Sequence, residues 1–465
     1  MKHQTTFALF FGNRGFFPET LIDEARTDIK SRLDELGFNS ISMDKSLTRY
    51  GAVETIAEGR IFADFLKKNQ GKYQGIILCL PNFGDENGAS EAMRDCDVPI
   101  FIHAYPDQLN RMDFTLRRDA FCGKLSIMDV FGQFGIPFTA WEPHTLAPAD
   151  PRFDEEIKAF AAVCRITAGL KRCRIGAIGA RPTAFKTIRF DEVALQKHGI
   201  TTETFDNSDL LLAMKKISSA SCREKMDFLK AYTNFSQVPE DKLETLARLS
   251  LALDSFIENY QLDALALRCW LDLEQTLQIS PCVILSELND RGFPAACELD
   301  VANALSMLAL KLASDSPPAC LDWNNNYENE ADKCILFHCG PVPQTLMTAK
   351  GQVVDHPMFA KSLGSGVAFG CNVGRIRPMN FTFASTTTLN GQVHFYTGEG
   401  QFTEDKIPNN FFGCGGVVQV DHLQQKLNRI GYGGFRHHVS IAEGWYAKSI
   451  REALTRYLGY RETEL

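Results

Sequence analysis

The first 165 residues alternate short apolar runs with segments whose apolar residues recur at helical spacing. The runs at 7–11, 75–80 and 98–102 have the length and composition of buried strands, and residues 19–36 have the period of an amphipathic helix. Strands and helices that alternate in this way predict a parallel sheet with helices on both faces. We therefore expect a Rossmann-like α/β domain over residues 1–165.

A second alternation of the same kind follows a proline-rich stretch and a helical run. Residues 173–179 have the pattern of a strand and a turn, and residues 239–260 have that of a long helix. From Val301 onward the apolar positions again follow helical spacing, and we place the start of this helix at Glu298. These features predict a second Rossmann-like α/β domain over residues 166–332.

The pattern changes at about residue 333, where short runs of β-branched and aromatic residues are separated by glycine and asparagine. Three such runs are 366–370, 380–384 and 393–397. They predict antiparallel strands, and a helix is expected near residues 444–458. The chain as a whole is thus predicted to be an α/β protein with two parallel sheets, followed by a C-terminal antiparallel β-barrel domain over residues 333–465.

Composition narrows the classes of function. The 465 residues are 45% hydrophobic and 23% charged, which is typical of a globular protein too long for a single core. The net charge of −8 gives no excess of positive field, so we expect neither nucleic acid nor an anionic membrane surface as a partner. A small-molecule substrate is then the default.

The start of the chain and its cysteines both favour a cytoplasmic location. The first residues resemble a strand rather than a signal peptide, because a short apolar run ends at Gly12 without a small-residue cleavage site. No window approaches the ~20 uninterrupted apolar residues that a membrane helix needs. The 14 cysteines are scattered without a Cys-x-x-Cys pair, which favours buried, reduced thiols over a metal cluster or a redox motif.

Two acidic residues and a histidine pair offer the best candidates for chemistry. Glu298 is expected at the start of a helix, Asp322 at the carboxyl end of a short strand, and His437 and His438 in a strand, where only one of them can face a given site. Carboxylates with an imidazole suit a hard divalent cation. Taken singly, each residue also has an ordinary structural explanation, such as a helix first turn or an Asx-turn.

His338 is less informative by itself. It lies in the apolar run Ile335-Leu336-Phe337-His338, where a lone histidine is usually a hydrogen-bonded core residue, although its imidazole could provide a further metal ligand.

At these residues the chain resembles the L-fucose isomerase and L-arabinose isomerase group of metal-dependent aldose–ketose isomerases, over nearly its full length. The segment from Ala296 to Asp300 is similar to the fucose isomerase segment that carries the first metal carboxylate, and Cys320-Leu321-Asp322 is similar to the strand end that carries the second. In both relatives a His-x-Val pattern marks the metal histidine, which points to His437, with His438 as the alternate.

The resemblance implies a mechanism and a cofactor. Glu298 and Asp322 would bind the metal and also act as the acid–base pair that moves a proton between C1 and C2 through a cis-enediolate. His338 matches an additional metal histidine of the arabinose isomerase side. The oxygen-rich ligand set favours Mn²⁺, with Mg²⁺ as the alternative. A homo-oligomer with sites at subunit interfaces is also implied.

The resemblance further implies contacts to the substrate, which would be an L-fucose-like or another hexose. They are Arg14, an asparagine assigned to position 92, Arg268, Trp270 and Arg436; the residue at position 92 is Ala92. Arg436 stands where fucose isomerase has Asn and arabinose isomerase has His. Because a guanidinium pairs with phosphate or sulfonate, we hypothesise an anionic, 6-phosphorylated or 6-sulfonated substrate; a structural salt bridge is the alternative role for Arg436.

Two other classes of function stay open at this point. Two α/β lobes also occur in non-catalytic sugar-binding and sensor proteins, which need no cage of carboxylates and histidine. A nucleotide-dependent oxidoreductase would use Gly176 and Gly179 as a phosphate cradle, but a third glycine and a downstream acid are missing. Metal analysis of the purified protein separates the isomerase from both.

Overall fold

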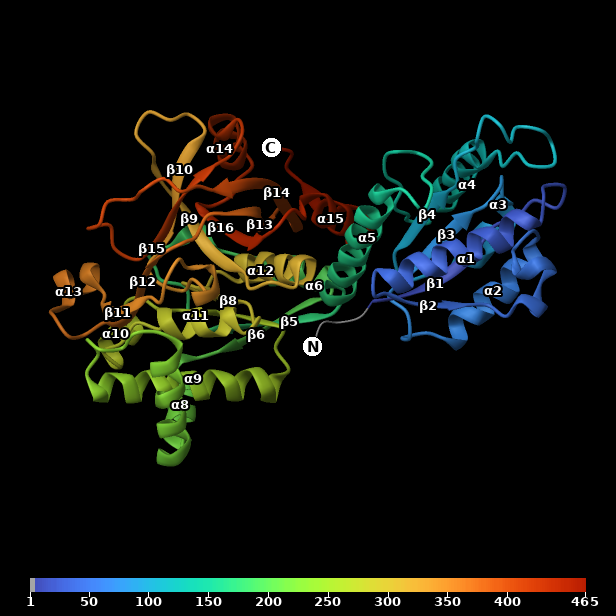
Figure 1. Ribbon diagram of the computed structural model, residues 1–465. Helices are drawn as coiled ribbons and strands as arrows, with labels where there is room; N and C mark the ends of the chain where they lie inside the picture. The colour runs from blue at the N-terminus through green and yellow to red at the C-terminus, as the bar shows by residue number, and fades with distance from the viewer. Residues whose placement is uncertain (1–4) are drawn as a thin grey trace. The chain divides into compact units, whose positions relative to one another are not determined.

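The computed structural model describes residues 5–465 (Figure 1). They form two compact units: the residues up to Ala168 together with Glu452–Leu458, and Gly169–Arg451 together with Gly459–Leu465. The first boundary lies close to the expected one at residue 165. Within residues 5–465, no helix is both long and apolar enough to cross a membrane.

The first unit contains the expected parallel sheet. Its strand order is β2-β1-β3-β4, and every neighbouring pair is parallel. Its strands and helices are β1 (Thr6–Phe11), α1 (Thr20–Glu35), β2 (Asn39–Ser42), α2 (Ile56–Lys68), β3 (Gly75–Leu80), α3 (Glu86–Met93), β4 (Ile100–Ala104), α4 (Ala120–Phe134) and most of α5 (Pro151–Leu170). All residues of β3 and β4 are buried, as expected for strands covered on both faces.

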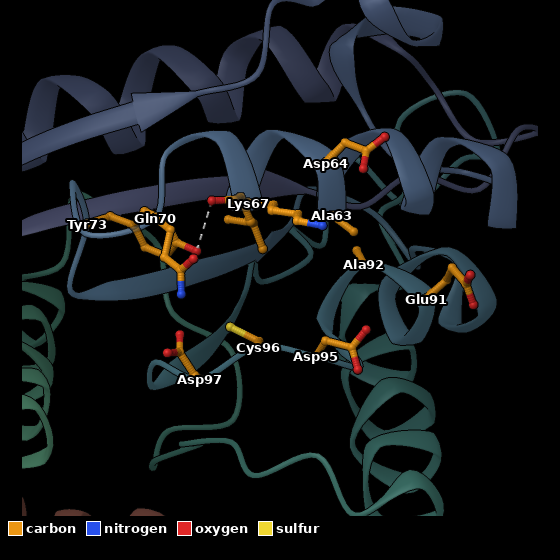
Figure 2. A pocket seen from close by; sticks show the side chains of 11 residues that line it. Ala63, Asp64, Lys67, Gln70, Tyr73, Glu91, Ala92, Asp95, Cys96 and Asp97 are labelled. Carbon is orange, nitrogen blue, oxygen red and sulfur yellow. Dashed lines mark hydrogen bonds between the residues drawn. The ribbon is translucent and has the colours of Figure 1, made fainter. Parts of the chain in front are cut away.

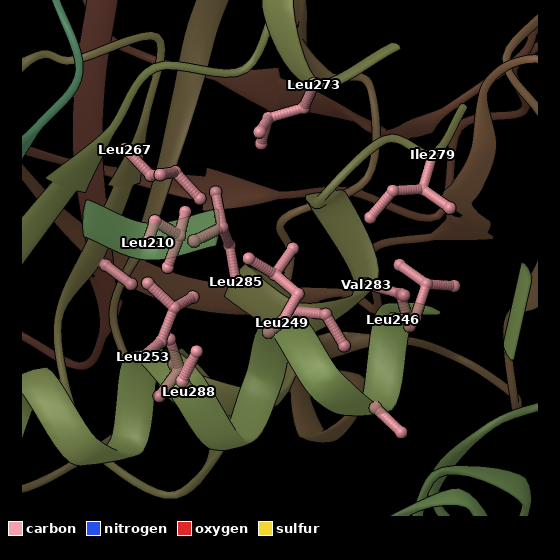
Figure 3. Packing of buried hydrophobic residues seen from close by; sticks show 14 of the residues in the cluster. Leu210, Leu246, Leu249, Leu253, Leu267, Leu273, Ile279, Val283, Leu285 and Leu288 are labelled. Carbon is pink, nitrogen blue, oxygen red and sulfur yellow. The ribbon is translucent and has the colours of Figure 1, made fainter. Parts of the chain in front are cut away.

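The second unit begins with another four-stranded parallel sheet, of order β6-β5-β7-β8. Its strands and helices are β5 (Cys173–Ile178), α6 (Glu192–Lys197), β6 (Ile200–Phe205), α7 (Asn207–Lys216), α8 (Ser219–Tyr232), α9 (Glu240–Tyr260), β7 (Ala264–Leu267), α10 (Asp272–Thr276), α11 (Cys282–Asp290), β8 (Ala295–Cys297) and α12 (Val301–Ser314). Leu246, Leu249 and Leu253 of α9 recur at helical spacing and belong to one buried cluster with Leu285 and Leu288 of α11 (Figure 3).

The remaining strands form a nine-stranded sheet of order β11-β12-β15-β10-β9-β16-β13-β14-β17. Its strands and helices are β9 (Ala319–Asn326), β10 (Lys333–His338), β11 (Gln352–Asp355), α13 (Pro357–Leu363), β12 (Phe369–Arg375), β13 (Met379–Leu389), β14 (Gln392–Phe402), β15 (Cys414–Gln419), α14 (Leu423–Tyr432), β16 (His438–Glu443), α15 (Ala447–Glu452) and β17 (Arg461–Glu462).

This sheet differs from the expected antiparallel barrel. Most neighbouring strands are antiparallel, but β12 pairs with β15, and β14 with β17, in parallel, so the sheet is mixed. An additional pairing between β14 and β15 joins six strands into a ring. The expected domain boundary at residues 332 and 333 separates β9 from β10, which are neighbours in this sheet.

Helix α12 links the two sheets of the second unit. It packs against β5, β7 and β8 of the parallel sheet and against β9, β13 and β16 of the mixed sheet (Figure 1). Its residues are almost all buried, which explains why the apolar pattern extends around most of the helix. The amino end of α12 therefore lies where β8, β9 and β16 come together.

Candidate metal centre

Glu298, Asp322 and His438 converge at this point of the second unit. Glu298 follows the last residue of β8, and Asp322 of β9 is paired in register with His438 of β16. Nε2 of His438 lies 3.1 Å from Oε2 of Glu298 and 3.5 Å from Oδ1 of Asp322. Two carboxylates and an imidazole from three distant segments thus share one site.

The backbone at Glu298 explains why this side chain leaves the strand at an unusual angle. Glu298 and Leu299 have φ values of 62° and 65°, in the left-handed region that residues other than glycine rarely adopt. The expected helix start at Glu298 is wrong, because α12 begins at Val301, with Asp300 as its N-cap accepting a hydrogen bond from the Asn303 amide. Two strained residues in succession at a cluster of acids are typical of a functional site.

Asp322 was expected at the carboxyl end of its strand, but it lies inside the strand. Strand β9 continues to Asn326 and pairs with β10 on one edge and β16 on the other. Oδ1 of Asp322 is buried and accepts no hydrogen bond from the described residues. A buried acceptor without a donor costs about 1–3 kcal/mol, so this atom is placed for a ligand.

The ring of His438 is oriented by Asp300. Its Nδ1 lies 2.7 Å from Oδ2 of Asp300, whose pKa stays well below its usual range, because Arg436 and His438 outweigh the effect of burial. An ionised carboxylate only accepts hydrogen bonds, so Nδ1 carries a hydrogen. In the neutral ring the lone pair is then on Nε2, which faces Glu298 and Asp322. This carboxylate–histidine pairing is the arrangement that orients metal-binding imidazoles.

The surrounding acids also change the proton affinity of this ring. Burial lowers the pKa of His438, but hydrogen bonds to Asp300 and Glu298 outweigh burial and raise it to about 10. For Glu298 the two effects have the opposite signs. Burial raises the pKa of this carboxyl, but the hydrogen bond and charge of His438 lower it by more, so the net shift is downward. Without another cation, a proton on Nε2 neutralises part of the acidic cluster. A metal ion would compete with that proton for the same nitrogen.

His437 also reaches the cluster. The expectation was that only one of the two adjacent histidines would face the site. It precedes β16 and so escapes the alternation of side chains along the strand. Its Nε2 is 3.9 Å from Oδ1 of Asp322, and its side chain is 45% exposed. Within residues 5–465, Asp322, His437 and His438 have ligand atoms that all lie within 4.8 Å of one another.

His338, at the end of β10, completes a second group with Glu298 and His438, again with ligand atoms within 4.8 Å. The amide of Cys339 donates a hydrogen bond to Nδ1 of His338 at 2.9 Å. In the neutral ring the hydrogen is then on Nε2, which is buried and has no partner among the described residues. His338 therefore offers the site an N–H donor more readily than a lone pair.

The donor atoms fit a hard divalent cation. Neighbouring ligands of an octahedral ion with bonds of about 2.1 Å are about 3 Å apart, close to the separations of His438 from Glu298 and Asp322 given above. The set contains carboxylate oxygens and imidazole nitrogen but no thiolate, as Mn²⁺ or Mg²⁺ prefers. Oδ1 of Asp322, which accepts no hydrogen bond from the described residues, supports the same conclusion.

Arg436 is not placed to contact a substrate, contrary to the expectation. Its side chain is 1% exposed and lies 3.1 Å from Oδ1 of Asp300. Its other hydrogen bonds go to the carbonyl oxygens of Thr187 and Thr386 and to the hydroxyl of Thr387. The alternative role, a structural salt bridge, agrees with this geometry.

A cavity of about 260 Å³ opens beside the candidate metal centre. Its walls include Glu298, Asp322 and His338, together with Trp270, one of the expected substrate contacts. Arg268 follows the carboxyl end of β7 but does not line the cavity; its Nε is buried without a partner among residues 5–465.

The other two expected substrate contacts belong to the first unit. Arg14 forms an ion pair with Glu86 and donates to the carbonyl of Gly84 at 2.9 Å. The assignment of an asparagine to position 92 is wrong: Ala92 is buried in α3, and its methyl group cannot hydrogen-bond a sugar. Ala92 lines a separate pocket of about 430 Å³, whose other walls carry Asp64, Asp95 and Asp97 (Figure 2).

Gly176 and Gly179 have a packing explanation. A Cβ at Gly176 would lie 2.6 Å from Cδ1 of Leu262, and Gly179 has a φ of 91° with Arg268 and Asn207 close by. The next α-helix, α6, begins only at Glu192, so no helix start lies beside these glycines to form the phosphate cradle.

Several important residues were not found from the sequence. Asp300 was noted only as the last residue of the segment that resembles fucose isomerase, and Glu274 and His356, which line the cavity, were not singled out. The helical spacing that begins at Val301 marks Asp300 as an N-cap, but nothing in the order of residues indicates its contact with His438. All 14 cysteines are free and most are buried.

Two family models match this chain. The N-terminal domain of fucose/sulfoquinovose isomerase matches residues 8–171, and the C-terminal domain of L-fucose isomerase matches residues 336–464.

Relatives include three proteins named sulfoquinovose isomerase. The one from Clostridium sp. (strain MSTE9) is 28% identical over 237 residues, 48% of this chain and 51% of that protein. The one from Priestia megaterium is 23% identical over 326 residues, 70% of this chain and 71% of the relative. The one from Alkalicoccus urumqiensis is 25% identical over 311 residues, which are 66% of this chain and 68% of the relative. The matched region thus spans only about half of the Clostridium protein.

Among solved structures, a periplasmic solute-binding protein of an ABC transporter from Actinobacillus succinogenes, with bound D-allose, covers 67% of this chain and 93% of its own, at 12% identity and a TM-score of 0.17. A likeness this weak carries no argument about fold or function.

Proposed function

The chain belongs to the fucose isomerase superfamily, and on that premise we propose that it is a metal-dependent isomerase that interconverts an aldose and a ketose. The observation that carries this proposal is the convergence of Glu298, Asp322 and His438 beside a cavity large enough for part of a sugar. A sugar-binding module has no need of such a cluster.

We propose Glu298, Asp322 and His438 as the metal ligands. Mn²⁺ is the preferred ion and Mg²⁺ the alternative, because the ligand set is rich in oxygen. When bound, the ion stabilises the negative charge that develops on the two sugar oxygens. His437 is the alternative imidazole ligand, and His338 would donate its Nε2 hydrogen to a substrate oxygen.

The two carboxylates would also transfer the proton. Their side chains are 17% and 18% exposed, so both reach the cavity. One carboxylate would remove the proton from C2 of the aldose to give a cis-enediolate. A proton would then be delivered to C1 while the hydrogen of O2 moves to O1, which gives the ketose. The strained backbone at Glu298 fixes the direction of one of these groups.

For the substrate we propose a hexose, with a 6-sulfonated sugar as the first to test. The names of the three relatives support the sulfosugar. The charge recognition cannot come from Arg436 in the geometry described above, so another cation would have to contact the sulfonate. We also propose that the protein is cytoplasmic and that it forms a homo-oligomer. Light scattering of the purified protein would test the oligomeric state.

One experiment tests the activity. The protein is stripped with a chelator, reloaded with Mn²⁺ or Mg²⁺, and assayed for ketose formation from sulfoquinovose, D-glucose 6-phosphate, D-glucose, L-fucose and L-arabinose. Turnover that depends on the metal supports the isomerase. Tight sugar binding without turnover, in protein that contains the metal, would favour a binding module instead.

A further inference from the structure

The cavity has a second set of polar residues outside the metal centre. Glu274 and His356 both line it, and each is 1% exposed. Oε2 of Glu274 and Nδ1 of His356 are buried and have no hydrogen-bond partner among residues 5–465. Because each unsatisfied buried polar atom costs about 1–3 kcal/mol, two of them around one cavity indicate that a ligand supplies the missing partners.

The backbone holds these residues in a defined frame. The segment that enters β12 accepts two hydrogen bonds, from the amide of Ser280 to the carbonyl of Phe369 at 2.8 Å and from the amide of His356 to the carbonyl of Ala368 at 3.0 Å. The hydroxyl of Ser280 then donates to Oε1 of Glu274 at 3.0 Å. Ser280 thus fixes one carboxyl oxygen of Glu274 and leaves the other free.

Gly370 makes this close approach of the chain segments possible. A Cβ at this position would lie 1.8 Å from the carbonyl oxygen of Ser280, and the residue has a φ of 135°. Only glycine accommodates both conditions. The placement of Ser280, and through it that of Glu274, therefore depends on a specific backbone rather than on a flexible loop.

The charges around the cavity indicate which chemical group the free atoms recognise. Among the described residues that line it, none is a lysine or an arginine. A hydroxyl group both donates and accepts hydrogen bonds, so it can satisfy a carboxyl oxygen and an imidazole nitrogen together. An anionic group would lack a cationic partner here.

We propose that Glu274 and His356 form a subsite that binds hydroxyl groups of the sugar away from the carbons that react, and that this subsite determines which sugars are turned over. The inference rests on the proposed isomerase function. It assigns recognition of hydroxyls to this part of the cavity, so a charged substituent of the substrate would be bound elsewhere.

The test uses the Mn²⁺-loaded protein and deoxy analogues of the aldose that the wild type turns over best, each lacking one hydroxyl from C3 to C6. We expect at least one analogue to lose about 10- to 100-fold in kcat/KM, which corresponds to one lost hydrogen bond to a buried or charged partner. In Glu274→Ala or His356→Ala, the parent sugar should lose a similar factor, while the analogue loses less than about threefold.

The Mn²⁺ affinity of these variants should stay within about threefold of the wild type, because neither residue belongs to the metal centre. Glu274→Met, which keeps the length of the side chain but offers no strong hydrogen-bonding atom, is the second variant in case the alanine substitution prevents folding, and it should lose the preference for the parent sugar in the same way. Glu287→Gln is the control, since Glu287 is also buried but pairs with Lys225 and Arg291 and does not line the cavity. The control should keep the preference of the wild type for the parent sugar.

Three results would overturn the subsite. One is an unchanged preference for the parent sugar in both alanine variants. Another is that the alanine variants lose kcat/KM equally for the parent sugar and all analogues and also lose affinity for Mn²⁺. A wild type that turns over no aldose would overturn the isomerase function and, with it, the subsite, whereas an active wild type with unaffected variants overturns the subsite alone.

Discussion

The carboxylate of Asp300 lies 2.7 Å from Nδ1 of His438 and is itself fully buried, so this acid orients the imidazole without reaching the cavity. Asp300 also caps helix α12 and pairs with Arg436. One side chain thus connects the start of helix α12, the mixed sheet and the candidate metal centre.

Asp300→Asn should weaken metal binding. The asparagine amide can present N–H to Nδ1, which would move the hydrogen to Nε2 and remove the lone pair that faces Glu298 and Asp322. Loss of such a supporting carboxylate typically costs 10- to 100-fold in metal affinity. Calorimetric titration with Mn²⁺ would measure this loss. An affinity equal to that of the wild type would contradict the role given to Asp300.

Substitution of the two adjacent histidines separates their roles. His438→Asn should lower Mn²⁺ affinity by more than 100-fold, because it removes a buried ligand whose neighbours are already in place. His437→Asn should lower the affinity by less than about tenfold, since this ring is half-exposed and 3.9 Å from Asp322. The reverse order of effects would make His437 the ligand, as the sequence pattern first indicated.

Glu298→Gln should abolish turnover while the protein stays folded. The amide retains the size of the side chain but cannot take up a proton, so we expect kcat to fall by at least about 1,000-fold, within the range for loss of a general acid–base group. Circular dichroism would confirm folding. Glu330→Gln, at an exposed acid, is the control and should be fully active; activity retained in Glu298→Gln would refute the assignment.

Arg436→Met should destabilise the protein rather than change its substrate preference. It leaves Asp300 as a buried charge without its guanidinium partner, and loss of one member of a buried pair costs about 3–5 kcal/mol. Urea denaturation measures this cost. A variant of normal stability that discriminates less between sulfonated and neutral sugars would instead restore Arg436 as a substrate contact.

Glu274 should make stability depend on pH. Burial raises the pKa of Glu274 from 4.5 to about 8, so between these values the folded protein holds a proton that the unfolded chain releases. Stability should therefore fall as pH rises from about 4.5 to 8 and then level off, with about 1.4 kcal/mol for each unit of pKa difference.

Glu274→Gln lacks this proton, so the free energy of unfolding of the variant should rise relative to the wild type across the same pH range. Denaturation of both proteins at several pH values checks this, since the other titrating groups contribute equally to both. A difference between the two proteins that does not vary with pH would rule out the raised pKa.

The sequence predicted most of the local structure, because hydrophobic period and length determine it. The parallel strands β1, β3 and β4 and the helices α1 and α9 agree with their apolar patterns to within about two residues. The parallel pairing of β12 with β15 could not be predicted, since it joins strands with no helical connection between them.

The site was predicted only in part, and for a physical reason. Residue types and the family resemblance together singled out the two carboxylates and the histidine pair as candidates, and the structure brings these side chains together. Whether a donor is free depends on contacts between distant segments, and these place Arg436 against Asp300 and leave Oε2 of Glu274 unpaired. Such contacts are not encoded in spacing along the chain.

The place of β9 in the mixed sheet also has a consequence for protein synthesis. One edge of β9 pairs with β10, which follows it directly, but the other edge pairs with β16, which the ribosome delivers far later. Until then a strand carrying Asp322 has an open edge, the kind that recruits strands of other molecules. A nascent chain should therefore assemble the cluster of Glu298, Asp322 and His438 only after β16 has been synthesised, and ribosomes that stall before β16 should yield aggregates.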